Sequence, residues 1–113
     1  MLTHFALWFK VYKEILKVKG EEATEQYRMD TKELMAVCEE KNGNYKPALD
    51  LFMEVFIYRK AKLRMSDKKS QEVGAKVGEC LIELREYNNA KDIFHDILKA
   101  VRSNGAGMAV LKC

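Results

Sequence analysis

Residues 45–55 read YKPALDLFMEV, and residues 87–97 read YNNAKDIFHDI. At the offset of 42 residues that carries Tyr45 to Tyr87, an alanine and a phenylalanine also coincide, and aliphatic residues fall on aliphatic residues. Apolar residues recur every three or four positions in both segments, which is the spacing of one face of an α-helix. The pair therefore predicts two equivalent amphipathic helices, each of which must bury an apolar face against a neighbour.

The similarity extends upstream of both segments at the same offset. Ala36 falls on Gly78, and Cys38 falls on Cys80. A small residue on a helix lets a second helix approach closely, so each unit is predicted to be a helical hairpin. Self-similarity at a fixed period of this size is typical of solenoid repeats.

Helical periodicity continues through almost the whole chain, and no stretch alternates for long with the period of two that a strand requires. Breaks are predicted at Gly20, Asn42-Gly43-Asn44, 66–70, 85–89 and 104–107, where glycine, asparagine and polar residues gather. The sequence therefore predicts an all-α chain with helices near 3–19, 22–41, 45–65, 69–85 and 88–102.

The repeated residues resemble tetratricopeptide (TPR) repeats. In that family a small residue on the first helix is followed by a large apolar residue, then by a tyrosine, an alanine and an aromatic residue. The repeat core that the resemblance implies consists of Ala36, Tyr45, Ala48, Phe52, Gly78, Tyr87, Ala90 and Phe94. Glu39 departs from the pattern, since it stands at the place of the large apolar residue. The resemblance implies a right-handed α-solenoid of antiparallel helix pairs.

The resemblance also divides the chain. It places two TPR-like repeats at 29–62 and 71–104, separated by the eight-residue insert 63–70, a spacing similar to that of the long-helix variety of the family. Residues 1–28 are expected to form a partial repeat or a cap, and residues 105–113 a tail. Solenoids usually need about three repeats, so we expect the chain to be part of a longer array or to dock on another protein.

Composition narrows the class of protein. Hydrophobic residues make up 48% and charged residues 33% of the 113 residues, which is ordinary for a soluble domain. The net charge of +3 is too small for a dedicated nucleic-acid binder, and the apolar run from Phe5 to Phe9 is too short to span a membrane. The three cysteines show no C-x-x-C spacing, which predicts free thiols and a cytoplasmic location, with a cytoskeletal or ciliary structure as the alternative.

Residues suited to catalysis are few, and the chain is predicted not to be an enzyme. His95 neighbours Asp96 and could form an acid/base pair, but it falls off the apolar stripe and is interpreted as a solvated side chain. Cys80 has acidic neighbours and is interpreted as a core residue. The Gly74-x-x-x-Gly78 spacing is interpreted as close helix packing, and Gly105 with its neighbours as a helix stop. No metal site and no cofactor are expected.

Positive charge gathers in one segment. Residues 59–69 contain six cations, Arg59, Lys60, Lys62, Arg64, Lys68 and Lys69, against the single acid Asp67. The favoured interpretation is the solvated end of a long helix, and the alternative is a basic patch for an acidic protein or for phosphates. Nucleic acid is an unlikely partner because the segment has no aromatic side chain on which a base could stack.

Acidic residues gather on the first helix of each pair. If the geometry of the family holds, these helices line a concave groove through Asp30, Glu33, Val37, Glu40, Glu72, Ala75, Glu79 and Glu83. Six of these eight residues are acids, whereas the TPR type that binds chaperone tails has lysine and asparagine at such places. The groove therefore favours a basic or amphipathic partner segment. The alternative is that these are ordinary solvated glutamates.

The function expected from these features is a non-enzymatic scaffold, or protein–protein interaction module, that binds partner peptides or helices in an acidic groove. The alternative is a structural subunit or fragment of a larger ciliary, cytoskeletal or motor assembly, present as an oligomer or as part of a complex.

Overall fold

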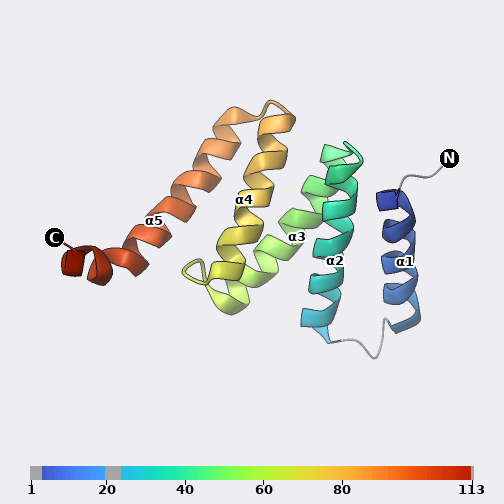
Figure 1. The fold of residues 1–113 in the computed structure, drawn as a ribbon, viewed down its shortest axis with the longest axis horizontal. Helices are drawn as coiled ribbons and strands as arrows, with labels where there is room; N and C mark the ends of the chain where they lie inside the picture. The colour runs from blue at the N-terminus through green and yellow to red at the C-terminus, as the bar shows by residue number, and fades with distance from the viewer. Residues whose placement is uncertain (1–3, 20–23, 113) are drawn as a thin grey trace.

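The structure, a computed structural model, describes residues 4–19 and 24–112. Within these residues it contains helices and no strand. The helices are α1 (His4–Lys19), α2 (Glu25–Lys41), α3 (Tyr45–Leu63), α4 (Lys68–Glu83) and α5 (Tyr87–Lys112). Consecutive helices pack against one another in antiparallel fashion along the chain (Figure 1). The prediction of an all-α chain with five helices is confirmed for the part of the sequence that the structure describes.

Side-chain caps fix where α2 and α4 begin. The Thr24 hydroxyl accepts a hydrogen bond from the Tyr27 N–H at 3.1 Å, and the Asp67 carboxylate accepts one from the Lys69 N–H at 2.8 Å. Both capping residues have extended backbone, so each helix starts at the following residue. The predicted start at residue 22 and the predicted break at Gly20 lie outside the described residues.

The turn after α2 and the turn after α4 have the same pattern of backbone hydrogen bonds. The N–H groups of Asn42, Gly43 and Asn44 donate to the carbonyls of Cys38, Glu40 and Glu39, and those of Leu84, Arg85 and Glu86 donate to Cys80, Ile82 and Leu81. The middle residue of each turn is left-handed, with φ of 80° at Gly43 and 65° at Arg85. The 42-residue correspondence between side chains therefore extends to the backbone of the two turns.

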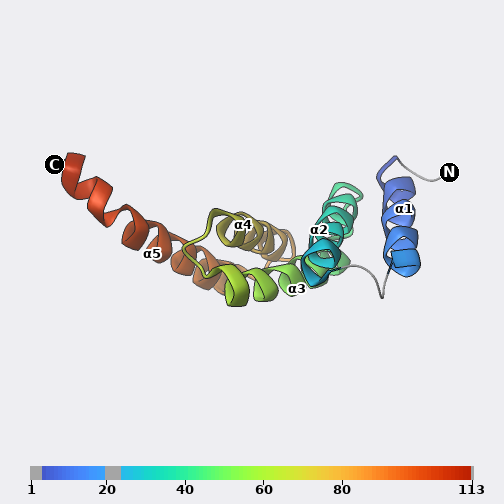
Figure 2. The same ribbon diagram turned by 90° about the horizontal axis from the view of Figure 1, so that it is seen from below.

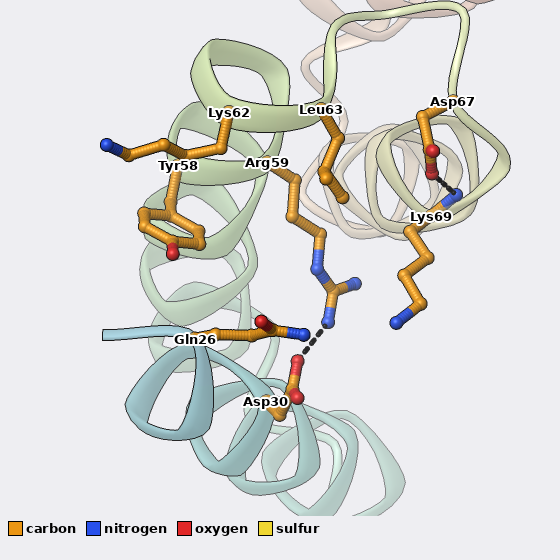
Figure 3. A pocket seen from close by; sticks show the side chains of 8 residues that line it. All are labelled: Gln26, Asp30, Tyr58, Arg59, Lys62, Leu63, Asp67 and Lys69. Atoms are coloured by element: carbon orange, nitrogen blue, oxygen red, sulfur yellow. Dashed lines mark hydrogen bonds and ion pairs between the residues drawn. The ribbon is translucent and has the colours of Figure 1, made fainter. Parts of the chain in front are cut away.

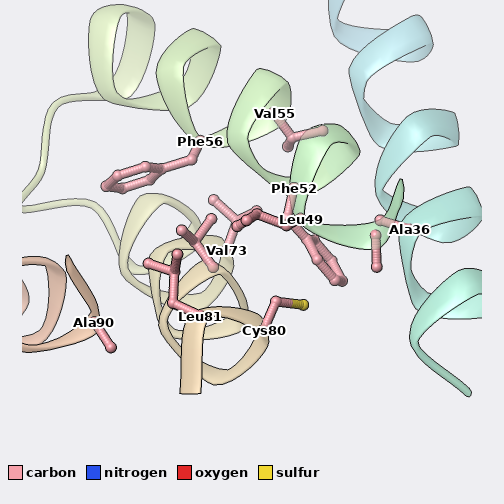
Figure 4. Close-up of a cluster of buried hydrophobic side chains, with 11 residues drawn as sticks. Ala36, Leu49, Phe52, Val55, Phe56, Val73, Cys80, Leu81 and Ala90 are labelled. Carbon is pink, nitrogen blue, oxygen red and sulfur yellow. The ribbon is translucent and has the colours of Figure 1, made fainter. Parts of the chain in front are cut away.

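A continuous apolar core joins α2 to α5 (Figure 4). Phe52 and Val55 of α3 lie at its centre with no exposed surface. Its buried members are Ala36, Ala48, Leu49, Phe52, Val55, Phe56, Val73, Val77, Cys80, Leu81 and Ala90. α3 and α4 supply most of these residues. This pair of helices therefore forms most of the core, against which α2 packs on α3 and α5 packs on α4.

Glycines on α4 allow its neighbours to approach closely, as the sequence predicts. A Cβ atom added at Gly78 would lie 2.5 Å from two atoms of the Phe94 ring of α5. One added at Gly74 would lie 2.9 Å from the Phe56 ring of α3. No side chain larger than hydrogen fits at either position unless these rings move.

Two predictions about particular residues are wrong. Residues 104–107 do not end the last helix, because α5 continues to Lys112; Cys113 lies outside the described residues. A glycine costs a helix only about 1 kcal/mol relative to alanine, and no proline follows to force a stop. The end of α3 at Leu63, where Arg64 takes a φ of 70°, lies within two residues of the predicted end. Tyr87, assigned to the core, is 59% exposed at the start of α5.

The molecule is elongated, with principal extents of 54 × 35 × 20 Å. Figure 2 shows α2 and α4 on the same side of α3. The two helices that carry the predicted acidic residues therefore lie on one side of the molecule.

Candidate functional site

A buried arginine is bonded to two of the predicted groove acids, Asp30 and Glu33 of α2. Arg59 extends from α3, donates from Nη1 and Nη2 to both carboxylate oxygens of Glu33 at 2.8 and 2.9 Å, and donates to Asp30 at 3.0 Å. Its side chain is only 7% exposed. The hydrogen bonds that Arg59 donates to Glu33 are the largest influence on the guanidinium and raise the pKa of Arg59 above its ordinary value. Two of the predicted groove acids are thus held by an internal cation.

A second cation joins the two helices. Lys76 of α4 lies 3.3 Å from the Glu40 carboxylate of α2 and 3.4 Å from the carboxylate of Glu79 on its own helix. Partial burial lowers the pKa of Lys76, but the nearby charges of Glu40 and Glu79 outweigh it and the net shift is upward. Lys76 therefore links Glu40 of α2 to Glu79 of α4.

The remaining predicted groove residues differ in their surroundings. Glu72 lies 3.9 Å from Lys68 across one helical turn, and both side chains are exposed. Glu83 is exposed and forms no salt bridge with any described residue. Val37 and Ala75 are half-buried. The surface has acids that a partner could reach, chiefly Glu79 and Glu83, and acids already paired within the fold.

The predicted basic patch loses its first member. Arg59 is buried and bonded to the acids of α2, because its long side chain reaches back across the α2–α3 pair instead of into solvent. Assigning it to a solvated patch is therefore incorrect. The other cations of the segment are exposed, and they are Lys60, Lys62, Arg64, Lys68 and Lys69. Lys60 also lies 5.5 Å from the centre of the Phe56 ring, a cation–π contact.

A cavity of about 280 Å³ lies beside Arg59, where the end of α3 meets the starts of α2 and α4 (Figure 3). Its walls consist of Gln26, Asp30, Tyr58, Arg59, Lys62, Leu63, Asp67 and Lys69. Both terminal nitrogens of Arg59 are engaged by carboxylates, and the Asp67 carboxylate is engaged by the start of α4. The cavity therefore has mixed charge, and its most buried cation is already neutralised.

The two thiols that the structure describes, Cys38 and Cys80, are buried. Cys80 is fully buried; this burial, together with the acids Glu40 and Glu79, raises its pKa to about 11. Burial and then the charge of Glu39 raise the pKa of Cys38 as well. His95 is exposed on α5. The described residues contain no cluster of three or more histidine, cysteine or acidic side chains suited to a metal ion.

Two features of this region were missed in the sequence. Lys76 stands three or four residues from Glu72 and Glu79, so counting helical neighbours could have identified it as the cation of this surface. The second feature is a small apolar slot between α1 and α2, formed on α2 by Leu34, Val37 and Cys38. Its α1 wall could not be placed from the sequence, because no repeat pattern covers residues 1–28.

Comparison with known proteins gives no family for this fold. No protein-family model matches the chain, and no curated protein or solved structure gives a match.

Among the described residues, none of the helices combines the length and the apolar character that crossing a membrane requires.

Proposed function

We propose that the chain is a TPR-like scaffold, built as a right-handed solenoid of helix pairs, that binds a partner protein without catalysing a reaction. The equivalent turns at 42–44 and 84–86 support repeated hairpins. So do the equivalent pairs of a small residue and a phenylalanine: Ala36 and Phe52 are both fully buried, and Gly78 lies against Phe94. Repetition of the same turn in two successive units is typical of a solenoid.

The observation that carries the binding proposal is the shared acidic surface of α2 and α4. Lys76 links Glu40 of α2 to α4, and the six acids of this surface outnumber the cations paired with them, which are Arg59, Lys68 and Lys76. Glu79 and Glu83 remain exposed. This balance favours a basic or amphipathic helical segment as the partner, since complementary charge directs both encounter and orientation.

The test is binding of a fluorescently labelled helical peptide of about 18 residues that carries leucine on one face and lysine on the other. We expect its affinity, measured by anisotropy, to fall as salt rises, because exposed charges are screened. The double variant Glu79→Lys/Glu83→Lys should weaken binding about five- to tenfold.

The matched control is Asp92→Lys/Asp96→Lys, which reverses two exposed acids with the same four-residue spacing on α5. An equal loss in both double variants, or binding that does not respond to salt, would contradict the assignment of the acidic surface.

A second candidate function is that of a structural subunit or fragment of a larger ciliary, cytoskeletal or motor assembly. The observation in its favour is apolar surface at both ends of the molecule, where Leu7 of α1 is 55% exposed and Leu98 of α5 is 46% exposed. The molar mass in solution separates the two functions. A monomer that binds the peptide favours the scaffold, and obligate association favours the subunit.

A further inference from the structure

Helix α1 is apolar on two faces, and only one of them is covered. Phe5, Phe9 and Tyr12 are half-buried on the side where α1 packs against α2. Leu7, Val11 and Val18 are 55%, 38% and 79% exposed on another side. Exposed apolar residues gathered on one side of a helix often mark an interaction surface. The exposed side of α1 therefore has the composition of an interface.

The slot between α1 and α2 forms the edge of this exposed side. Its walls are His4, Phe5, Trp8 and Tyr12 of α1 and Leu34, Val37 and Cys38 of α2. The Trp8 ring lies 6.2 Å from the His4 ring and 5.8 Å from the Tyr12 ring, so three successive turns of α1 line the slot with rings. Trp8 is 42% exposed and Leu34 is 46% exposed. The volume of the slot, about 240 Å³, suits one large apolar side chain.

Charge around the slot indicates what kind of segment would fill it. Val37 lines the slot and also belongs to the acidic surface, with Glu33 and Glu40 one helical turn to either side of it. Asp30, one turn before Leu34, has a side chain that is 49% exposed. On α1, the three lysines Lys10, Lys13 and Lys17 fall on an arc away from the slot residues, since successive residues are about 100° apart. Asp30 and Glu33 are bonded to Arg59, and Glu40 is bonded to Lys76, so the negative charge open to a partner is the exposed part of Asp30 together with Glu79 and Glu83 of α4.

We propose that the slot between α1 and α2 receives a large apolar side chain from a basic amphipathic helix, whose cations face the acids of α2 and α4. This proposal rests on the proposed function, because it names the apolar anchor and the charge of the partner that the acidic surface binds. The apolar anchor places the partner helix across the exposed side of α1, and the acids set its orientation.

Trp8 is the only tryptophan of the chain, so its fluorescence reports on this slot alone. The experiment titrates the full chain with an unlabelled leucine/lysine peptide and with a matched peptide in which glutamate replaces every lysine. We expect the basic peptide to shift the Trp8 emission to shorter wavelength and to reduce acrylamide quenching about twofold or more, because an apolar side chain covers the ring. The acidic peptide should do neither.

Two leucine variants, one in the slot and one outside it, test whether the slot binds the peptide. Leu34→Gln should abolish the emission shift and weaken the basic peptide about tenfold. Leu98→Gln changes a leucine of α5 that is 46% exposed, as Leu34 is. It should leave the emission shift and the affinity unchanged, because Leu98 is not among the residues that line the slot. Circular dichroism of the two variants shows whether each retains its helices, and an intact Leu34→Gln protein that still gives the full shift would overturn the slot.

The remaining outcomes separate this proposal from the one on which it rests. Binding that depends on salt and on Glu79 and Glu83 but leaves Trp8 unchanged would overturn the slot and retain the acidic surface. An equal shift with the acidic peptide would overturn the basic character of the partner. A shift that grows with protein concentration alone, with a doubled mass, would show that a second copy fills the slot. Absence of any binding would overturn both proposals.

Discussion

Folding moves the Cys80 thiol from water into the apolar core, and the carboxylates of Glu40, Glu79 and Glu83 lie near it. Its burial first, and the charges of Glu40 and Glu79 second, raise its pKa to about 11. In the unfolded chain a cysteine titrates near pH 8.5. Between these two pH values the folded chain holds a proton that the unfolded chain releases. The contribution of Cys80 to stability is therefore complete below about pH 8 and is lost as the pH rises toward 11.

We predict that this loss is measurable in the free energy of unfolding. Between pH 8 and pH 10.5 the parent chain should lose about 2 kcal/mol more than the Cys80→Ala variant, which has no thiol to ionise. The measurement is urea denaturation at both pH values under reducing conditions. The other ionisable groups are present in both proteins, so the difference reports on Cys80. Identical pH dependence of the two proteins would show that the thiolate is not penalised by the fold.

Single residues also show where sequence reasoning stops. The core positions of Cys38 and Cys80 were predictable, because their 42-residue correspondence places both on the inner side of a hairpin. Arg59 was not, because its partners Glu33 and Asp30 are 26 and 29 residues away in the chain. Local charge counting assigns such an arginine to a solvated patch. Only the packing of α3 on α2 turns it into a buried ion pair.

Helices were predictable as elements, and their ends only in part. The period of apolar residues located α3 and α4, and the spacing of Gly74 and Gly78 predicted a close helix contact on α4. The end of α5 was misplaced, because a glycine penalty of about 1 kcal/mol competes with backbone hydrogen bonds whose gain the sequence does not display. The slot beside α1 was not predictable either, since it depends on how α1 lies on α2.

The contact between α4 and α5 gives a prediction for Gly78→Ala. In an isolated helix this substitution would stabilise by about 1 kcal/mol. Here the new methyl group would meet the Phe94 ring at 2.5 Å, and overpacking of this kind costs about 1–3 kcal/mol. We therefore expect the urea midpoint to fall with the m-value unchanged.

Gly74→Ala is the matched comparison. Its new methyl group would meet Phe56 at 2.9 Å and the terminal carbon of Ile97, a flexible side chain, at 3.1 Å, so its cost should be smaller. A Gly78→Ala protein as stable as the parent would mean that α5 adjusts its position freely on α4, and the close packing of this helix pair would then not be a requirement of the fold.

At the scale of the whole molecule, the two units differ in what covers their second helices. Phe56 of α3 is 4% exposed because α4 lies over it, with Gly74 in contact with its ring. Leu98 of α5, 42 residues further on, is 46% exposed. The same position is thus buried in the first unit and uncovered in the second. If the units stack as a solenoid, another helix equivalent to α4 would cover Leu98.

This reasoning predicts the behaviour of a longer chain, made by inserting a second copy of residues 62–103 directly after Ser103. The junction preserves the 42-residue register, so the first copy of α5 continues as α3 does and is followed by a second α4. We expect the urea midpoint and the m-value to rise, because each added unit contributes its own core and an interface with its neighbour.

Leu98→Gln should change stability by less than about 0.5 kcal/mol in the parent chain, where the residue is exposed. In the first copy of the longer chain it should cost about 1–2 kcal/mol, because the residue becomes buried. Two separate unfolding transitions, or the same small cost in both chains, would show that the two hairpins resemble each other without stacking as repeats.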